Sequence, residues 1–212
     1  MSDETFHLGA EVRSSDGRDV GELVHVLVGP DYRLRALVVK ENTSFSGHGF
    51  APRSWLVNDE FIVPKDAVKS ATSDRIELSL SAADVRLLPP YLGYREKSET
   101  TTEVLSDTAG PLLASPELPR WLEQFANKRA DELEIDGGEN VMLRNTGRKL
   151  GTVKDVLFDG DQLVGVVLQP EGWFRDEVIL PRRFLERSDD LALFASIDEA
   201  DLKRLKPFRP SE

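Results

Sequence analysis

The sequence of 212 residues contains no cysteine. This excludes disulfide cross-links, thiol nucleophiles and cysteine-based zinc or iron–sulfur sites. No apolar run approaches the roughly 18 residues that a membrane-spanning helix needs. The first residues, Met1-Ser2-Asp3-Glu4-Thr5, also lack the basic and then apolar order of a secretory signal. We therefore expect a cytoplasmic protein without a membrane span.

Positive charge is scarce and scattered. The net charge is −11, and no basic cluster is longer than a pair such as Arg182-Arg183. Acidity is concentrated in residues 96–135, which carry a net charge of −5, against −3 for residues 1–95 and −3 for residues 136–212. A surface of this kind repels polyphosphate over most of its area, so we do not expect nucleic acid to be the main partner.

The sequence also lacks a recognisable catalytic constellation. Gly-x-Ser-x-Gly is absent, and Gly47-His48-Gly49 precedes no strand-to-helix unit that would cradle a phosphate. Adjacent acids such as Asp59-Glu60 point to opposite faces of a strand, so they cannot easily address one reacting group. The histidines His7, His25 and His48 lie at irregular spacing, and we interpret them as a surface, a strand and a loop residue. We assign no catalytic residue, no metal site and no cofactor, and expect a non-enzymatic protein.

What the chain does contain is a repeat. Residues 12–91 recur, with gaps, as residues 142–208. The first copy opens with Gly17-Arg18-Asp19-Val20-Gly21 and the second with Gly147-Arg148-Lys149-Leu150-Gly151. A unit of roughly 75 residues is longer than the repeats of solenoids and propellers, which indicates two similar domains. We predict domains at 1–95 and 136–212, joined by an acidic linker at 96–135.

Each copy has the pattern of a small β domain. Apolar residues alternate along short runs bounded by Gly and Asp turns, which predicts antiparallel strands. A short closing helix is expected after Ser81 and after Ser196, where a hydroxyl and a later acid can cap the free amides. Short strands with one closing helix favour an antiparallel β-barrel. The residues expected in the barrel cores are Val26, Leu37, Val39, Ile62, Val156, Val166, Leu168 and Ile179.

The order of these motifs resembles the PRC-barrel superfamily, which includes the photosynthetic reaction-centre H subunit and ribosome-maturation proteins. Each copy has Gly-Arg-x-Val/Leu-Gly, a hairpin, an Ile-x-Pro strand end and a final Leu-x-Pro-Tyr/Phe. A pair of such units, with Glu171-Gly172-Trp173-Phe174 in the second, is similar to bacterial tandem PRC-barrel proteins. The resemblance implies an all-β fold of two small antiparallel PRC-type barrels, each closed by a short C-terminal helix. Because the motifs are turns and core positions, they specify a fold rather than a biochemical role.

The two copies differ by an insertion in the first, at Asn42 to Trp55. The inserted segment is rich in small residues yet carries larger side chains, namely Phe45, His48, Phe50, Arg53 and Trp55. Aromatic residues on a loop often anchor a binding partner. They can equally fold back and cap the end of the barrel, and the sequence leaves both alternatives open.

The linker contains a second candidate contact element. Trp121, Leu122 and Phe125 occur at i, i+1 and i+4, with polar residues between them, which predicts an amphipathic helix near 118–131. Its apolar stripe needs a cover, supplied either by one of the barrels or by a partner.

The sequence therefore favours an adaptor or assembly module that binds protein partners. The expected contact surfaces are the barrel faces, the loop at 42–55 and the linker helix, and a homodimer is one arrangement left open. The first alternative is a small-ligand or metal sensor that uses the first-barrel loop. The second is an RNA- or ribosome-associated maturation factor, which the acidic charge disfavours.

Overall fold

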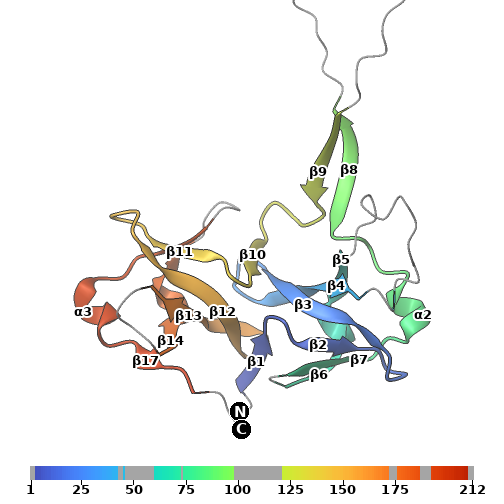
Figure 1. The fold of residues 1–212 in the computed structure, drawn as a ribbon, viewed down its shortest axis with the longest axis horizontal. Helices are drawn as coiled ribbons and strands as arrows, with labels where there is room; N and C mark the ends of the chain where they lie inside the picture. Colours follow the sequence, from blue (N-terminus) through green and yellow to red (C-terminus); the bar gives the residue numbers. More distant parts are fainter. Residues whose placement is uncertain are drawn as a thin grey trace, which may run out of the picture.

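The computed structural model describes residues 3–42, 45, 60–72, 74–97, 121–171, 176–186 and 192–209. In these residues the protein is mostly β-strand, with a few short helices. Two large sheets account for most of the strands, one from each half of the chain, and a separate ribbon of two strands lies between the halves in the sequence (Figure 1).

The first sheet has seven strands. Six of them follow the order β5-β4-β3-β2-β7-β6, and the seventh, β10, pairs with β3 beside that path. Their bounds are β2 Glu11–Arg13, β3 Asp19–Val28, β4 Leu34–Glu41, β5 Glu60–Pro64, β6 Val68–Ala71, β7 Arg75–Leu78 and β10 Leu133–Asp136.

The second sheet has eight strands and repeats this plan. Its order is β15-β16-β11-β12-β13-β14-β17, and β1 pairs with β12 beside the path. The bounds are β1 Asp3–His7, β11 Asn140–Leu143, β12 Lys149–Asp159, β13 Gln162–Pro170, β14 Val178–Pro181, β15 Leu185–Glu186, β16 Leu193–Ala195 and β17 Lys206–Pro207.

Three local features occur in both halves. The first hairpin of each half turns at a glycine with positive φ, Gly17 at 78° and Gly147 at 65°, a conformation that costs glycine no steric clash. A 3₁₀ turn follows the proline-ended strand in both halves, as η2 Lys65–Ala67 and η3 Arg182–Phe184. A four-residue helix follows later, as α2 Ala82–Val85 and α3 Glu199–Leu202.

The expectation of closed barrels is wrong, because the hydrogen-bonded order of each sheet is an open path. The outer edge of β5 is covered by the segment after α2: the Ile62 amide donates to the Pro89 carbonyl at 3.0 Å, and the Tyr91 amide donates to the Glu60 carbonyl at 2.9 Å. In the second half β17 pairs with β14 at the equivalent edge. The edge that would close each barrel is therefore taken by the C-terminal segment of the same half.

The halves exchange strands. β1, from the start of the chain, pairs antiparallel with β12 of the second half, and β10, which precedes the second repeat, pairs antiparallel with β3 of the first. The two central hairpin turns also meet, since the Leu34 amide donates to the Asp161 carbonyl and the Leu163 amide to the Tyr32 carbonyl. The halves are therefore joined by backbone hydrogen bonds on both sides of their contact.

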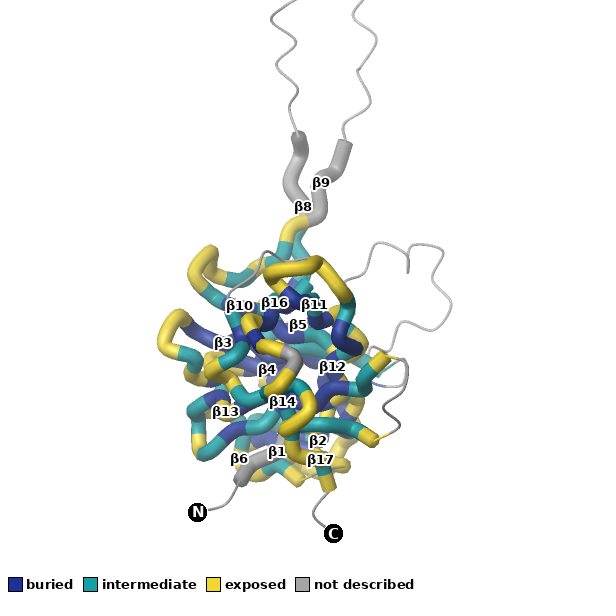
Figure 2. The backbone as a smooth tube through the Cα atoms, turned by 90° about the vertical axis from the view of Figure 1, so that its left-hand side faces the viewer, coloured by how far each residue is buried: buried dark blue, intermediate teal, exposed yellow. Residues whose placement is uncertain are grey.

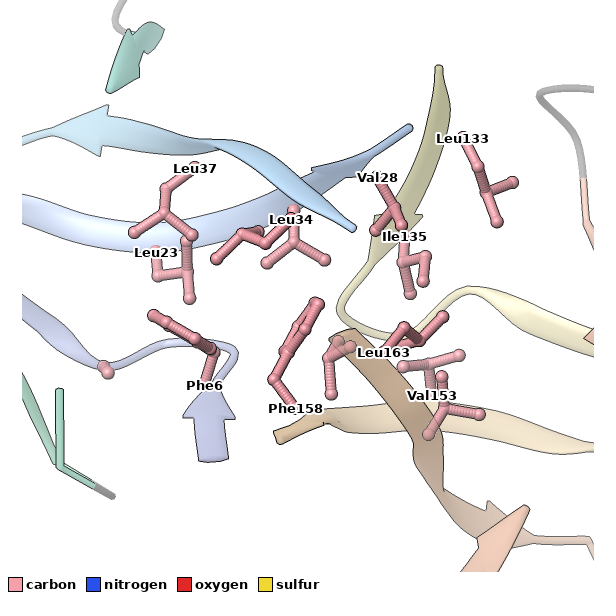
Figure 3. Close-up of a cluster of buried hydrophobic side chains, with 14 of the residues drawn as sticks. Phe6, Leu23, Val28, Leu34, Leu37, Leu133, Ile135, Val153, Phe158 and Leu163 are labelled. Carbon is pink, nitrogen blue, oxygen red and sulfur yellow. The ribbon is translucent and has the colours of Figure 1, made fainter. Parts of the chain in front are cut away.

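One cluster of buried hydrophobic side chains runs through both halves. Figure 2 shows the buried segments along the backbone, and Figure 3 shows part of the cluster. At its centre the ring of Phe6 meets that of Phe158 edge-on, with centroids 5.5 Å apart. Six of the eight predicted core residues are fully buried. Ile62 and Ile179 are only half-buried, because β5 and β14 turn the neighbouring Val63 and Leu180 inward, a slip of one residue.

The linker element is a strand and not a helix, so the prediction of a helix at 118–131 is wrong for the described residues from 121 onward. β9 Trp121–Ala126 pairs antiparallel with β8 Leu92–Lys97, in register from Leu92 opposite Ala126 to Lys97 opposite Trp121. Aromatic residues favour strands, and the complementary strand lies upstream in the chain, where a helix-only pattern gives no hint of it. The two strands form an arm, β8–β9, that extends away from both sheets (Figure 1). No helix among the described residues is long and apolar enough to cross a membrane.

Candidate functional site: the root of the arm

A cluster of charged side chains lies where the arm meets the first sheet. His25 on β3 is the register partner of Asp136 on β10, and Glu134 lies two residues earlier on the same face of β10. The pairing of β3 with β4 shifts by one residue between Leu23 and His25, a bulge that turns His25 onto the outer face of the sheet. Glu60, at the start of β5, approaches from the other side.

His25 is surrounded by carboxylates. Its Nδ1 is hydrogen-bonded to Oδ1 of Asp136 and lies 3.6 Å from Oε1 of Glu134, and its Nε2 lies 4.0 Å from Oε2 of Glu60. Lys128, just after β9, places its Nζ 3.1 Å from Oε2 of Glu134, and its side chain is 8% exposed. An imidazole and one ammonium group thus face three carboxylates in a largely desolvated space.

Tyr91 covers this cluster from the side of the arm. Its ring is buried and tilted 37° to the His25 ring, with centroids 5.5 Å apart. Burial, and next the hydrogen bond to Glu134, raise the pKa of the Tyr91 phenol. The hydroxyl therefore keeps its proton at neutral pH.

The surroundings also raise the pKa values of His25 and Glu139. Burial disfavours the charged form of His25, but the hydrogen bond and the negative charge of Asp136, followed by Glu134 and Glu60, outweigh it and raise the pKa of His25. Burial raises the pKa of Glu139 to about 7, helped by the charges of Asp136 and Glu134. The Glu139 carboxylate also accepts a hydrogen bond from the Asp136 amide at 3.2 Å.

The cluster is an ion-pair network more than an open metal site. His25, Glu134 and Asp136 offer donor atoms within 4.8 Å of one another. However, Lys128 already neutralises Glu134, and His25 donates to Asp136, so the positive charge that a metal would supply is present in the side chains. We assign no metal to it.

Apolar packing and backbone hydrogen bonds fix the arm beside the charged cluster. Tyr91 belongs to a small hydrophobic cluster on the outer face of the first sheet, against which Leu92 and Ala126 of the arm pack. The Asn127 amide donates to the Tyr91 carbonyl at 2.6 Å, and its side chain donates to the Pro90 carbonyl at 3.3 Å. Both strands of the arm are thus tied together at their base.

The residues singled out from the linker lie on this arm. Trp121, Leu122 and Phe125 all belong to β9. Phe125 is 39% exposed, and its ring occupies the space over Gly93 of β8 that a side chain there would fill. A strand in place of a helix therefore still presents part of the predicted apolar set at the surface.

The loop candidates are placed only in part. Phe45 is buried, its amide donates to Oδ1 of Asn42 at 2.7 Å, and Arg86 lies over its ring, 4.8 Å from the centroid. These contacts place Phe45 itself against the first half. His48, Phe50, Arg53 and Trp55 lie outside the described residues.

The halves meet along two seams: β10 pairs with β3 at the first, and β1 pairs with β12 at the second. A related pair of side chains joins the halves at the second seam. His7 Nδ1 lies 2.8 Å from Oδ1 of Asp155, which also accepts the Leu8 amide at 3.3 Å. Asp155 is 1% exposed, and its Oδ2 has no hydrogen-bond partner in the described part of the chain. Burial raises the pKa of Asp155, with Glu177 adding to the rise and His7 and the Leu8 amide opposing it.

Sequence reasoning missed the role of His25, which it treated as an ordinary strand residue. A signal was present, because aligning the Gly21 and Gly151 motifs places His25 against Asp155, so that both copies have a titratable residue at the same position of the strand. The acids that meet His25 come from β5 and β10, and a one-strand pattern does not show which strands are neighbours.

The comparisons with known proteins identify one region. Residues 137–198 match the family model of the PRC-barrel domain. The matched segment runs from the turn after β10 to the residue before α3, so it includes β11 to β16. No curated protein matches the chain.

Proposed function

We propose that the first half is a second, diverged PRC unit, so that the chain is a tandem of two such units. The proposal rests on the equivalent sheet orders, the glycine turns at Gly17 and Gly147, and the equivalent amide bonds from Tyr91 to Glu60 and from Phe208 to Glu177. Reciprocal strand exchange between the halves agrees with an origin by duplication, since each unit lends the other its leading strand.

We further propose that the protein is a non-enzymatic adaptor that binds a protein partner through its β8–β9 arm. The observation that carries this proposal is that the arm forms a two-stranded sheet of its own, outside both large sheets. An isolated two-stranded hairpin is marginally stable in water, so a ribbon kept at this position is expected to gain stability from what it contacts. A two-stranded ribbon can extend a partner's sheet through backbone hydrogen bonds.

The arm also carries the apolar residues that suit a contact surface. Phe125 is partly exposed there, and Trp121 and Leu122 share its strand. Aromatic side chains supply much of the free energy of binding at protein interfaces. The loop at 42–55 remains a second proposed contact, because His48, Phe50, Arg53 and Trp55 are still predicted anchors.

Site-specific photo-crosslinking in the native cell tests this function. A photoreactive amino acid replaces Glu123 in the arm, and the matched control carries it at Leu87, an 84% exposed residue on the body. We expect a discrete crosslinked protein from position 123 that position 87 does not give. The Trp121→Ser/Phe125→Ser variant should abolish that adduct while its circular dichroism spectrum stays that of the parent. Equal adducts from both positions, or an adduct that survives the double substitution, would rule out the arm as the contact surface.

A further inference from the structure

Both roots of the arm rest on this cluster of titratable groups. The ring of Tyr91, immediately before β8, lies against the His25 ring, with centroids 5.5 Å apart. Lys128, two residues after β9, forms an ion pair with Glu134 at 3.1 Å. Glu134 in turn shares His25 with Asp136 and Glu60.

We propose that the protonation state of His25 and Glu139 sets the pose of the arm, which is anchored when His25 is charged and released when His25 is neutral and Glu139 is ionised. This inference rests on the proposed function of the arm as a contact surface, and it adds control by pH to that function.

The charges that face His25 explain why the arm is anchored when His25 is protonated. On the side of the arm they are Glu60 from β5, Glu134 and Asp136 from β10, and Lys128 from the segment after β9, with Glu139 behind Asp136. On the other side His25 borders a groove between the halves, with a volume of about 370 Å³, that also carries Glu22 and Lys154. With His25 charged, two cations face three carboxylates at the root.

Deprotonation removes this near balance. Once His25 is neutral, Lys128 alone faces Glu60, Glu134 and Asp136, and ionised Glu139 adds a fourth negative charge close to Asp136. Like charges at this spacing in a partly buried site repel one another. Movement of Glu134 would relieve the repulsion and break its ion pair with Lys128, which loosens the hold on the arm.

The groups titrate in a range that makes such control useful. Burial raises the pKa of Glu139 to about 7, and the surrounding carboxylates, which outweigh burial, raise the pKa of His25 above its ordinary value. Release should therefore begin near pH 7 and be complete at higher pH. The second seam offers a natural comparison, because its His7–Asp155 pair contacts no arm.

Hydrogen exchange of the full chain, without any partner, tests the proposal. Exchange times at pH 5.5, 7.0 and 8.5 are scaled to equal intrinsic rates, and peptides covering β8 and β9 are compared with peptides from β12 and β13. We expect protection of the arm to fall by about tenfold between pH 5.5 and 8.5, the change that corresponds to a pKa difference of about 1 between the anchored and the released arm. Protection of β12 and β13 should change less.

Variants separate the switch from general loosening. His25→Gln keeps a hydrogen-bond donor but no charge, so its arm should exchange faster than the parent arm at pH 5.5. It should reach the exchange rate of the parent arm at pH 8.5 once Glu139 ionises, near pH 7. Glu139→Gln should delay the loss of protection to higher pH, and the matched control His7→Gln should leave the arm profile unchanged. If His25→Gln does not fold, Lys128→Gln takes its place, with an arm that is loose at every pH.

The experiments test the pH switch and the adaptor function separately. An arm with flat protection across this pH range, or a Glu139→Gln profile equal to that of the parent, overturns the switch. Neither result affects crosslinking from position 123, which tests the adaptor function alone. A pH-dependent arm that yields no adduct would keep the switch and overturn the function.

Discussion

The two seams between the halves share a backbone plan and differ in chemistry. At the first, β10 brings an acid, Asp136, to a histidine on the long strand, His25; at the second, β1 brings a histidine, His7, to an acid on the long strand, Asp155. The same pair of residue types occurs at both, with the two positions exchanged. Each seam therefore has one histidine–aspartate contact, but the histidine lies on the long strand at the first seam and on the short strand at the second.

The surroundings then give each pair a different character. Asp155 is enclosed by the second half, so burial dominates its behaviour and one of its oxygens lacks a described partner. His25 lies on an outer face, where Glu60, Glu134 and Lys128 extend the pair into a network covered by Tyr91. We therefore expect the second seam to serve stability, and the first, on the proposed switch, to link stability to the position of the arm.

The largest effect is expected from breaking the core that both halves share. Phe158→Ala should lower the free energy of unfolding by about 3–5 kcal/mol, because it removes the edge-on contact with Phe6 and leaves a cavity. Since the two rings come from strands of different halves, we expect peptides of both halves to lose exchange protection together in urea. The surface control Leu87→Ala should change stability by at most about 0.5 kcal/mol. Destabilisation confined to one half would show that the halves unfold independently.

A glycine pair tests whether the halves are truly equivalent. An alanine methyl at Gly21 would collide with the Lys40 carbonyl, and one at Gly151 with the Gln169 carbonyl, across the same strand pair of each half. Each substitution should cost about 2–3 kcal/mol through overpacking, with Gly21 the more sensitive because its φ is 152°.

The control for that pair is Gly17→Ala, where the added methyl meets open space and only the positive φ is unfavourable. It should cost about 1 kcal/mol. Melting curves of the three variants provide the measurement. A neutral Gly151→Ala beside a costly Gly21→Ala would limit the equivalence of the halves to their topology.

Much of this architecture could be predicted from the sequence, for reasons that differ by element. The glycine turns and the alternating strands of each copy are local, so spacing revealed them, as it revealed Leu37 and Val166 in the core. The exchange of β1 and β10 depends on contacts between distant segments, which local patterns do not encode. The same limit explains the wrong helix at 118–131, since the strand there is specified by its pairing with β8.

The two seams should also differ in how they make the free energy of unfolding depend on pH. The folded-state pKa values of Asp155, Glu139 and His25 are all raised, so the folded protein binds protons more tightly than the unfolded chain. For each group the favourable contribution is complete below its unfolded pKa and is lost as pH rises through its folded pKa. We expect the free energy of unfolding to fall by about 1–3 kcal/mol between pH 5 and pH 8, because a pKa that differs by 1 between the folded and unfolded states corresponds to about 1.4 kcal/mol.

Single variants show which seam causes each part of this fall in the free energy of unfolding. Asp155→Asn cannot ionise, so it should flatten the more acidic part of the profile and raise stability at pH 8 by about 1 kcal/mol, because no charge is buried. His25→Gln should flatten the part above the ordinary histidine pKa of about 6.5 and leave the acidic part as in the parent. Urea titrations at half-unit pH intervals measure both. A profile that Asp155→Asn leaves unchanged would contradict the dominance of burial at the second seam.

The smallest effect is expected from metal removal. At the first seam Lys128 and protonated His25 already neutralise most of the charge of Glu60, Glu134 and Asp136, so a divalent ion would have to displace an ammonium group and a proton. We therefore expect the Tm to be the same with chelator and with added zinc at pH 6, within the scatter of the scan. Lys128→Gln removes the competing cation and gives the most sensitive test of the comparison. A rise in Tm with zinc in that variant but not in the parent would show that Lys128 keeps the site closed. A rise in the parent itself would mean that the first seam binds metal, and that its ion-pair network is only one of its states.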